Sequence, residues 1–364
     1  MSPVDQVLAL VRPEILALAP YSSARKESKG GRVWLDANEN PATPAASLPS
    51  VALAKDGRLN LNRYPEPQPA DLLAKLSGLY SMSPTQCLVT RGSDEGIDLL
   101  LRTFCRAGQD AILITPPTYG MYVVAAGIQG AKVVSVPLVR AKNFALEADA
   151  VLAAVTKDVK IVFLCSPNNP TGGLLERAAV MKVVRALAGR AIVAVDEAYV
   201  DFSGQPSLAA EIPANPNLVI LRTLSKAFGL AGARVGTTLA DAAVIAVLQK
   251  VIAPYPIPSP VLTAALAALT PEGLAAAQQS VATLIAERNR LAAALAKLPL
   301  VKTVWPSDTN YLLIEVPDAA KAMAAARHTG VIWRDRSKDV PNTIRITIGT
   351  AAENNETLEV LSRV

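Results

Sequence analysis

The sequence predicts an α/β fold, in which a mainly parallel sheet lies between two layers of helices and a smaller α+β unit follows. Two features carry this prediction. Between residues 87 and 239, short apolar runs alternate with helical segments, as in folds built from parallel strands. Four prolines within residues 253–260 then interrupt the pattern and mark a boundary between two units.

The N-terminal part of the chain is expected to be irregular. Residues 36–70 contain six prolines, which prevent a long helix. We therefore expect an extended arm that leads into the main unit. The predicted division is residues 1–45 for the arm and part of the small domain, 46–255 for the large domain and 256–364 for the small C-terminal domain.

The large domain is predicted to begin with a helix and to continue with strands. Leu72, Leu73, Leu76 and Leu79 recur at helical spacing and predict a helix over residues 71–80. The predicted strands are Cys87–Thr90, Ala111–Thr115, Lys132–Val136, Lys160–Cys165, Ala191–Val195, Leu218–Arg222 and Val235–Leu239. Most of these runs lack polar alternation, which is typical of strands buried on both faces. Helices predicted between them include Asp94–Cys105 and Glu176–Leu187.

The C-terminal part mixes helices and strands without the regular alternation of the large domain. A long helical region is predicted after residue 260. The elements predicted beyond it are strands at Val301–Val304 and Tyr311–Glu315, a helix at Ala319–His328, and strands at Val331–Arg334 and Thr343–Ile348. This order predicts a small α+β domain.

Composition excludes several classes of protein. With 364 residues, 51% hydrophobic and 18% charged, the chain is typical of a folded globular enzyme. The net charge of +5 is spread without dense basic runs and aromatic residues make up only 4%, so a nucleic-acid partner is not expected. No apolar stretch has the length and character of a membrane helix, and the N-terminus lacks a signal-peptide pattern.

Cysteine and histidine are too few for a disulfide framework or a metal site. The chain has three cysteines without a C-x-x-C pair and one histidine, His328. Apolar neighbours flank each cysteine, so we expect buried reduced thiols and a cytoplasmic location. A Ser-His-Asp triad would have to use His328.

Ligands of a parallel sheet bind beyond the carboxyl ends of its strands, so the segments that follow the predicted strands form the candidate site. Arg91–Gly96 leads into an apolar helix whose N-terminus can receive a phosphate, although Ser93 or Asp94 acting as a simple cap explains the same residues. In Pro116–Gly120, Tyr119 either stacks on a flat ring or packs at the rim of the core.

Two further strand ends carry an amide and a carboxylate. Within the turn-forming run Ser166–Gly173, Asn169 is fixed by the proline after it and can direct its amide at a ring oxygen. Asp196 follows another buried strand, where a carboxylate is costly unless it meets a cation such as a protonated pyridine nitrogen. An ordinary Asn-Pro turn and a helix cap are the alternatives.

Lys226 is the strongest candidate for covalent chemistry. It follows the strand Leu218–Arg222 and stands among small and apolar residues. Burial disfavours the charged ammonium form, and a neutral amine attacks an aldehyde to form a Schiff base. Ser225 and Arg234 can bind a phosphate beside it. The alternative is a lysine that is simply solvated.

These segments resemble the fold-type I pyridoxal-phosphate (PLP) aminotransferases and, within them, the histidinol-phosphate aminotransferase subfamily. The resemblance covers about residues 20–350. It rests on Ser166–Gly172, Asp196–Tyr199, Ser225-Lys226, Arg234 and Arg345–Thr350 in this order. The subfamily is favoured by Pro20-Tyr21, Leu35–Pro41, Arg63–Pro67, Arg91–Gly96, Thr115–Tyr122, Thr309–Tyr311 and Arg334–Arg336.

The resemblance implies PLP as the cofactor and a role for each candidate. Lys226 would hold the cofactor as a Schiff base and then transfer the proton, and Asp196 would keep the pyridine nitrogen protonated. Asn169 and Tyr199 would bond the ring hydroxyl oxygen, and Tyr119 would stack on the ring. The residues implied for the phosphate are Ser93, Asp94, Ser225, Arg234 and Tyr64 of the partner subunit, so a homodimer with shared active sites is implied.

The substrates that the resemblance implies are histidinol phosphate and 2-oxoglutarate, in histidine biosynthesis. Arg334, Arg345 and Tyr21 would bind the anionic group of the substrate, with Asn38 and Asn310 close by. Arg336 either enlarges this site or faces solvent, and we expect solvent. The alternatives are an aromatic-amino-acid aminotransferase, a phospho-amino-acid decarboxylase of the same fold, and a non-catalytic binding protein, which would call for the loss of Lys226.

Overall fold

The computed structural model describes residues 33–36, 38 and 65–364, so most of the predicted N-terminal arm lies outside the described residues. The helices are α4 (Ala70–Leu79), α5 (Gly92–Phe104), α6 (Met121–Gln129), α7 (Ala148–Ala154), α8 (Arg177–Ala186), α9 (Ala242–Leu248), α10 (Ser259–Ala268), α11 (Pro271–Leu295), α12 (Ala319–Thr329) and α13 (Ala351–Ser362). The strands are β1 (Val33–Trp34), β2 (Cys87–Thr90), β3 (Ala111–Ile114), β4 (Lys132–Ser135), β5 (Val159–Cys165), β6 (Ile192–Asp196), β7 (Leu218–Thr223), β8 (Gly236–Leu239), β9 (Thr303–Val304), β10 (Tyr311–Glu315), β11 (Val331–Ile332), β12 (Arg334–Asp335) and β13 (Thr343–Thr347).

The largest sheet contains all seven strands predicted between residues 87 and 239, with ends that differ by one residue at most. Their order is β2-β8-β7-β6-β5-β3-β4. Only β8 runs antiparallel to its neighbours in this sheet. The prediction of an α/β fold with a mainly parallel sheet is therefore confirmed.

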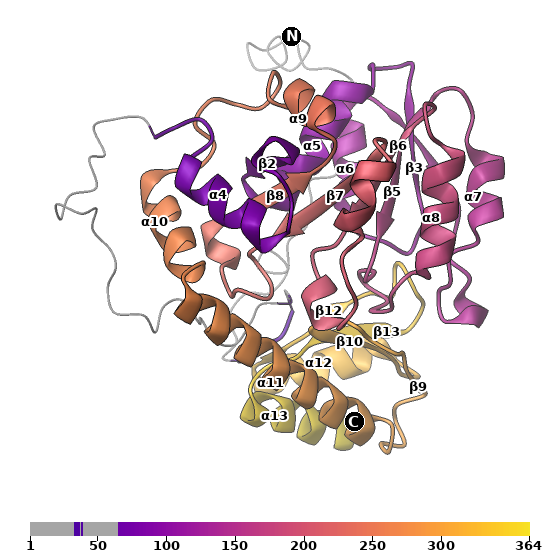
Figure 1. The fold of residues 1–364 in the computed structure, drawn as a ribbon. Coiled ribbons are helices and arrows are strands. Elements are labelled where there is room, and N and C mark those ends of the chain that lie inside the picture. The colour runs from indigo at the N-terminus through magenta and orange to yellow at the C-terminus, as the bar shows by residue number, and fades with distance from the viewer. Residues whose placement is uncertain (1–32, 37, 39–64) are drawn as a thin grey trace, which may run out of the picture.

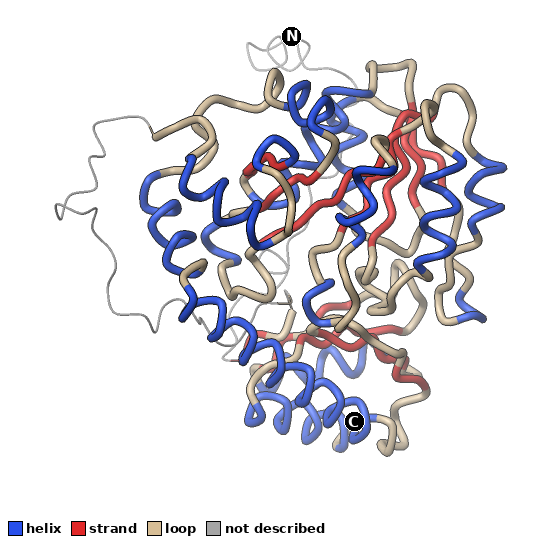
Figure 2. Tube along the Cα trace, viewed as in Figure 1, coloured by secondary structure: helices blue, strands red, loops and turns tan. Residues whose placement is uncertain are grey.

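Helices cover both faces of this sheet (Figures 1 and 2). The side chains of β5 alternate between the two covers: Ile161 and Phe163 pack with residues of α5, α6 and α9, whereas Val162 and Leu164 pack with residues of α7 and α8. This explains why the strand has no polar alternation. Strand β4 is an exception: its residues are mostly exposed in this chain because it lies at the edge of the sheet.

The C-terminal part forms a second sheet of four antiparallel strands, in the order β12-β13-β10-β9. Its strand β13 alternates cleanly: Ile344 and Ile346 join the core formed with α11, α12 and α13, while Arg345 and Thr347 point to the opposite face. The predicted strand Val331–Arg334 is divided in the structure. Its first two residues pair with β1, whereas Arg334 pairs with β13 in the other sheet.

The predicted long helical region after residue 260 is two helices, because Thr270 caps a new helix that begins at Pro271. Among the described residues, no single helix is both long and apolar enough to cross a membrane; α10 and α11 reach that standard only as a pair, which is bent by 72°. Helix α13 was not among the predicted elements. The division of the chain at residue 256 stays a prediction.

Candidate functional site

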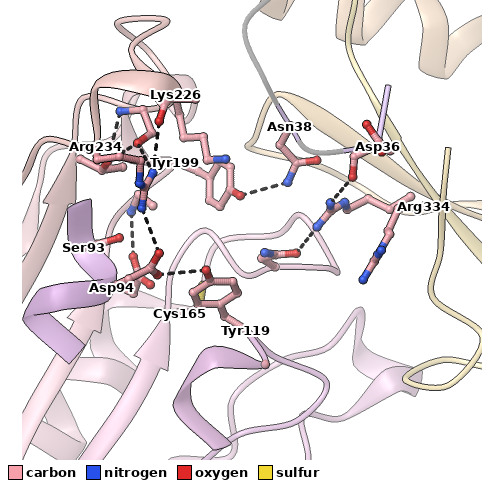
Figure 3. Close-up of a pocket in the computed structure, with 18 of the residues that line it drawn as sticks. Asp36, Asn38, Ser93, Asp94, Tyr119, Cys165, Tyr199, Lys226, Arg234 and Arg334 are labelled. Atoms are coloured by element: carbon pink, nitrogen blue, oxygen red, sulfur yellow. Dashed lines mark hydrogen bonds and ion pairs between the residues drawn. The ribbon is translucent and has the colours of Figure 1, made fainter. Parts of the chain in front are cut away.

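One pocket of about 260 Å³ lies where the carboxyl ends of β5, β6 and β7 face the small C-terminal sheet. Figure 3 shows Lys226, Arg234 and Ser93 on one side of this pocket and Arg334 and Asp36 on the opposite side. Twelve of the predicted site residues line it: Asn38, Ser93, Asp94, Tyr119, Asn169, Asp196, Tyr199, Ser225, Lys226, Arg234, Arg334 and Arg345. Segments that are far apart in the sequence thus meet at one place.

Asp196 is a buried carboxylate at the end of β6, with 3% of its surface exposed. Its hydrogen-bond partners are neutral: the hydroxyl of Tyr122 donates to Oδ2 at 3.0 Å and the amide of Ala198 donates to Oδ1 at 3.1 Å. Burial raises the pKa of Asp196 to about 6, although both hydrogen bonds lower it. Because no cationic side chain of the described residues pairs with it, this carboxylate is suited to a cationic group that enters the pocket.

Lys226 lines the same pocket, and its Nζ lies 5.6 Å from the centre of the Tyr199 ring. It is half-buried, not buried as the sequence suggested, because it faces the pocket. The Tyr199 hydroxyl accepts a hydrogen bond of 3.0 Å from the amide of Asn38, so its own proton is directed elsewhere. Burial raises the pKa of Tyr199, which keeps the phenol protonated.

The side of the pocket that carries Ser93 and Arg234 is suited to a phosphate. Helix α5 begins at Gly92, so the amides of its first turn, which includes Ser93 and Asp94, have no partner within the helix. Arg234 donates to Asp94 Oδ2 at 3.1 Å and to the Ser225 hydroxyl at 3.4 Å. A side chain at Gly92 would meet the Arg234 guanidinium at 2.7 Å, and the φ of +73° there also favours glycine.

Tyr119 is fixed beside this end of the pocket. Its hydroxyl donates to Asp94 Oδ1 at 3.0 Å. Its ring packs edge-on against Tyr122, with ring centres 5.7 Å apart. One carboxylate, that of Asp94, therefore holds both the aromatic ring and the arginine of the candidate phosphate site.

The side of the pocket formed by the small sheet is cationic. Arg345 is 7% exposed, and it donates to Asn169 Oδ1 at 2.7 Å and to the carbonyl of Asp36 at 2.9 Å. Its Nε has no hydrogen-bond partner among the described residues, and no described carboxylate forms an ion pair with it. A buried guanidinium with only neutral partners is suited to an anionic ligand.

Some predicted site residues are placed differently. Asn310 is fully buried outside the pocket lining, where its amide donates to the carbonyl of Asn38 at 2.8 Å. It therefore holds the segment that carries Asn38. Arg336 was expected to face solvent, but it lines the pocket and its side chain is only 17% exposed. Tyr21 and Tyr64 lie outside the described residues.

Comparison with known proteins agrees with this geometry. Residues 31–361 match the family described as aminotransferase class I and II. The chain belongs to this family of aminotransferases. The resemblance noted in the sequence is thus confirmed at the level of the family.

Relatives of this aminotransferase span nearly its whole length. A histidinol-phosphate aminotransferase of Stenotrophomonas maltophilia is 46% identical over 364 residues, which are 99% of this chain and 97% of the relative. One of Aeromonas hydrophila is 46% identical over 354 residues, which are 97% and 96% of the two chains. The solved structure of a histidinol-phosphate aminotransferase of Sinorhizobium meliloti, in complex with pyridoxal-5'-phosphate, has a TM-score of 0.83 at 22% identity and covers 98% of this chain and 97% of its own. That likeness supports the fold.

Tyr122 is a residue of the aminotransferase site that the sequence prediction missed. It is fully buried on α6, where its ring stacks on Phe163 with centres 4.7 Å apart and its hydroxyl reaches Asp196. A signal was present, since Tyr122 lies at the start of a helix that directly follows the candidate segment Pro116–Gly120.

The side chains present fit PLP, the cofactor that the resemblance implies. Its aldehyde needs an amine, its pyridine nitrogen a carboxylate and its phosphate a cation with free backbone amides. Lys226, Asp196 and Arg234 with the start of α5 meet these three needs in one pocket. The observation that decides the fit is the buried Asp196 carboxylate, which has no cationic partner in the part of the chain that the structure describes.

Proposed function

We propose that this chain is a PLP-dependent aminotransferase that transfers the amino group of histidinol phosphate to 2-oxoglutarate, in histidine biosynthesis. The observation that carries the proposal is that Lys226 and the buried Asp196 line one pocket. The named relatives at 43–46% identity over nearly the full length support the choice of donor.

Each residue has a defined task in this proposal. When bound, PLP supplies a ring that withdraws electrons from the carbon bearing the amino group. Asp196 keeps the pyridine nitrogen positive through an ion pair, and Tyr199 and Asn169 bond the ring hydroxyl oxygen. Lys226, whose amine faces the pocket, removes and returns the proton at the reacting carbon. No catalytic histidine is needed.

Binding of the cofactor falls to the segments at the start of α5 and after β7. Ser93 and Asp94 offer backbone amides to the phosphate, and Ser225 and Arg234 offer a hydroxyl and a guanidinium. Tyr119 stacks on the ring. Since Asp94 already fixes both Tyr119 and Arg234, these groups are in place before the cofactor binds, which reduces the entropic cost of binding.

The substrate's anionic group binds on the side of the small sheet. Arg345 and Arg334 are Cα partners on neighbouring strands, and both line the pocket. Histidinol phosphate has no carboxylate, so its phosphate is the group that these guanidiniums receive; glutamate presents there the α-carboxylate, which stands on the amino-bearing carbon as the phosphate arm does in histidinol phosphate. Asn38 lines the same pocket, and its amide donates to the hydroxyl of Tyr199. Tyr21 is proposed to complete it.

We further propose that the protein acts as a homodimer in the cytoplasm, with Tyr64 of the partner subunit reaching the cofactor phosphate. The three free cysteines are buried, as expected for thiols that stay reduced.

A spectrum tests the chemistry. Purified protein with PLP is expected to show the absorbance band of a protein-bound Schiff base, and Lys226→Ala is expected to abolish the band while PLP still binds. A protein that cannot bind PLP, or a band that survives in the variant, would overturn the cofactor assignment.

A panel of amino donors tests the substrate. Histidinol phosphate, phenylalanine, tyrosine and a phospho-amino acid are each offered with 2-oxoglutarate, and glutamate formation and carbon dioxide release are measured. We expect histidinol phosphate to have the highest kcat/KM and no carbon dioxide to form. A better aromatic donor, or release of carbon dioxide without 2-oxoglutarate, would refute the choice of substrate.

A further inference from the structure

Arg336 has a position that the proposed roles do not yet use. Its backbone amide donates to the carbonyl of Thr343 at 2.9 Å, which extends the pairing of β12 with β13 by one residue. Side chains alternate along a strand, so Arg336 shares a face with Arg334, two residues before it. This explains why both side chains line the pocket.

Three arginines from two neighbouring strands therefore line one side of the pocket. Arg334 and Arg345 are direct cross-strand partners, an arrangement in which like charges destabilise a sheet. Arg336, which is ion-paired with Asp339, adds a third guanidinium on the same face. Such a cluster is stabilised when an anion of more than one charge binds to it.

The side chain of Arg336 is also held in place. Its Nη2 forms an ion pair of 2.9 Å with Asp339 Oδ2, three residues further along the chain. The segment that follows Arg336 turns back on it: the carbonyl of Arg336 accepts hydrogen bonds from the amides of Asp339 and Val340, at 2.9 Å each. A guanidinium fixed in this way loses little further freedom when an anion binds beside it.

We propose that Arg336 is a specificity-determining residue, which makes this anion site favour a doubly charged phosphate over the single charge of a carboxylate. The inference rests on the proposed function and deepens it. A carboxylate has one charge and two oxygens, which Arg334 and Arg345 can satisfy. A phosphate has about two charges and three acceptor oxygens, so a third guanidinium strengthens its binding far more.

The test measures the two amino donors separately. Histidinol phosphate or glutamate is added alone to the PLP-loaded protein, and the change in cofactor absorbance gives the half-saturating concentration and the limiting rate for each. For Arg336→Gln, we expect the half-saturating concentration of histidinol phosphate to rise about tenfold and that of glutamate by less than about threefold. Limiting rates should stay within about twofold, because Arg336 acts on binding.

Two further variants complete the design. Arg336→Lys keeps the charge but loses the planar fork, so an intermediate rise for histidinol phosphate is expected. Arg327→Gln changes the net charge equally, but it lies exposed on α12 away from the pocket lining, and both donors should bind as in the original protein. Thermal unfolding of all variants shows whether the fold is kept.

The outcomes separate the two proposals. If Arg336→Gln raises both half-saturating concentrations equally, or raises neither, while histidinol phosphate remains a good donor, the role of Arg336 is wrong and the proposed function stands. If the original protein does not react with histidinol phosphate but reacts with another donor, the proposed function itself fails.

Discussion

The hydroxyl of Tyr122 donates a hydrogen bond of 3.0 Å to Oδ2 of Asp196, at the bottom of the pocket. This bond lowers the pKa of the carboxyl, against the larger effect of burial that raises it to about 6. The pKa of Asp196 therefore lies close to neutral pH. Loss of the Tyr122 hydroxyl would raise this pKa further and reduce the ionised fraction of the carboxyl. Under the proposed function, Tyr122 would act on the cofactor through Asp196, as a positioning residue.

Tyr122→Phe should make cofactor binding more sensitive to acid. The variant keeps the ring that stacks on Phe163 but loses the donor, so the pKa of Asp196 rises further. The pH below which PLP affinity falls should move upward by roughly one unit, because a hydrogen bond to a charged group is worth about 1.5 kcal/mol or more. Titration of PLP binding from pH 5 to pH 9 measures this. Tyr80→Phe, which removes a buried hydroxyl away from the pocket, should leave the profile unchanged.

Asp196→Asn should stabilise the cofactor-free protein while it reduces transaminase activity. The pKa of Asp196 is about 6 in the folded state, above the ordinary aspartate value of 3.8. Between these two pH values the carboxyl is protonated in the folded state and ionised in the unfolded state. Stability therefore falls as pH rises from about 4 to 6, and the cost of about 3 kcal/mol is complete above pH 6. Urea unfolding should show the variant more stable at pH 8 and equal at pH 4. A less stable variant at pH 8 would contradict this.

Arg222→Met should destabilise the fold by about 3 kcal/mol. Arg222 is buried at the end of β7, where it pairs with Glu197 at 3.4 Å and with Asp201 at 2.7 Å and lies 4.9 Å from the centre of the Tyr80 ring. Its removal leaves Glu197, 2% exposed, without a cation. Urea unfolding measures the loss, and adding Glu197→Gln should recover part of it. A decrease of the free energy of unfolding below about 1 kcal/mol would show that Glu197 tolerates burial without Arg222.

The strands, and the meeting of Asp196 and Lys226 in one pocket, could be predicted from the sequence because each signal is local. Asp196 and Lys226 each follow a buried apolar run, and the carboxyl ends of parallel strands meet at one edge of a sheet. The pairing of Asp196 with Tyr122 could not be predicted in this way, because 74 residues separate them and a helical tyrosine among apolar residues reads as core. Only the packing of α6 on the sheet brings them together.

Other differences have physical causes that act over a distance. Arg336 reads as a surface residue, but the pairing of β12 with β13 turns it to the pocket and Asp339 holds it there. Asn310 was predicted to lie close to the substrate, but its amide donates to the backbone carbonyl of Asn38, outside the pocket lining. Helix α13 had a local signal that was not used: Thr350 and Glu353 form a capping box at its start.

Gly236→Ala should weaken the binding of the cofactor phosphate. A Cβ at Gly236 on β8 would lie 2.3 Å from the carbonyl carbon of Gly92 and 2.6 Å from the nitrogen of Ser93, both backbone atoms at the start of α5. The helix N-terminus must shift to relieve this overlap, which costs about 1–3 kcal/mol and displaces the amides proposed to bind the phosphate. The Kd of PLP should rise about tenfold or more, and the Kd of pyridoxal, which lacks the phosphate, should rise less. Gly78→Ala on α4, where a Cβ meets no atom within 4 Å, is the matched control and should leave both Kd values unchanged. Equal rises for PLP and pyridoxal would show that Gly236 maintains the pocket as a whole and not its phosphate end.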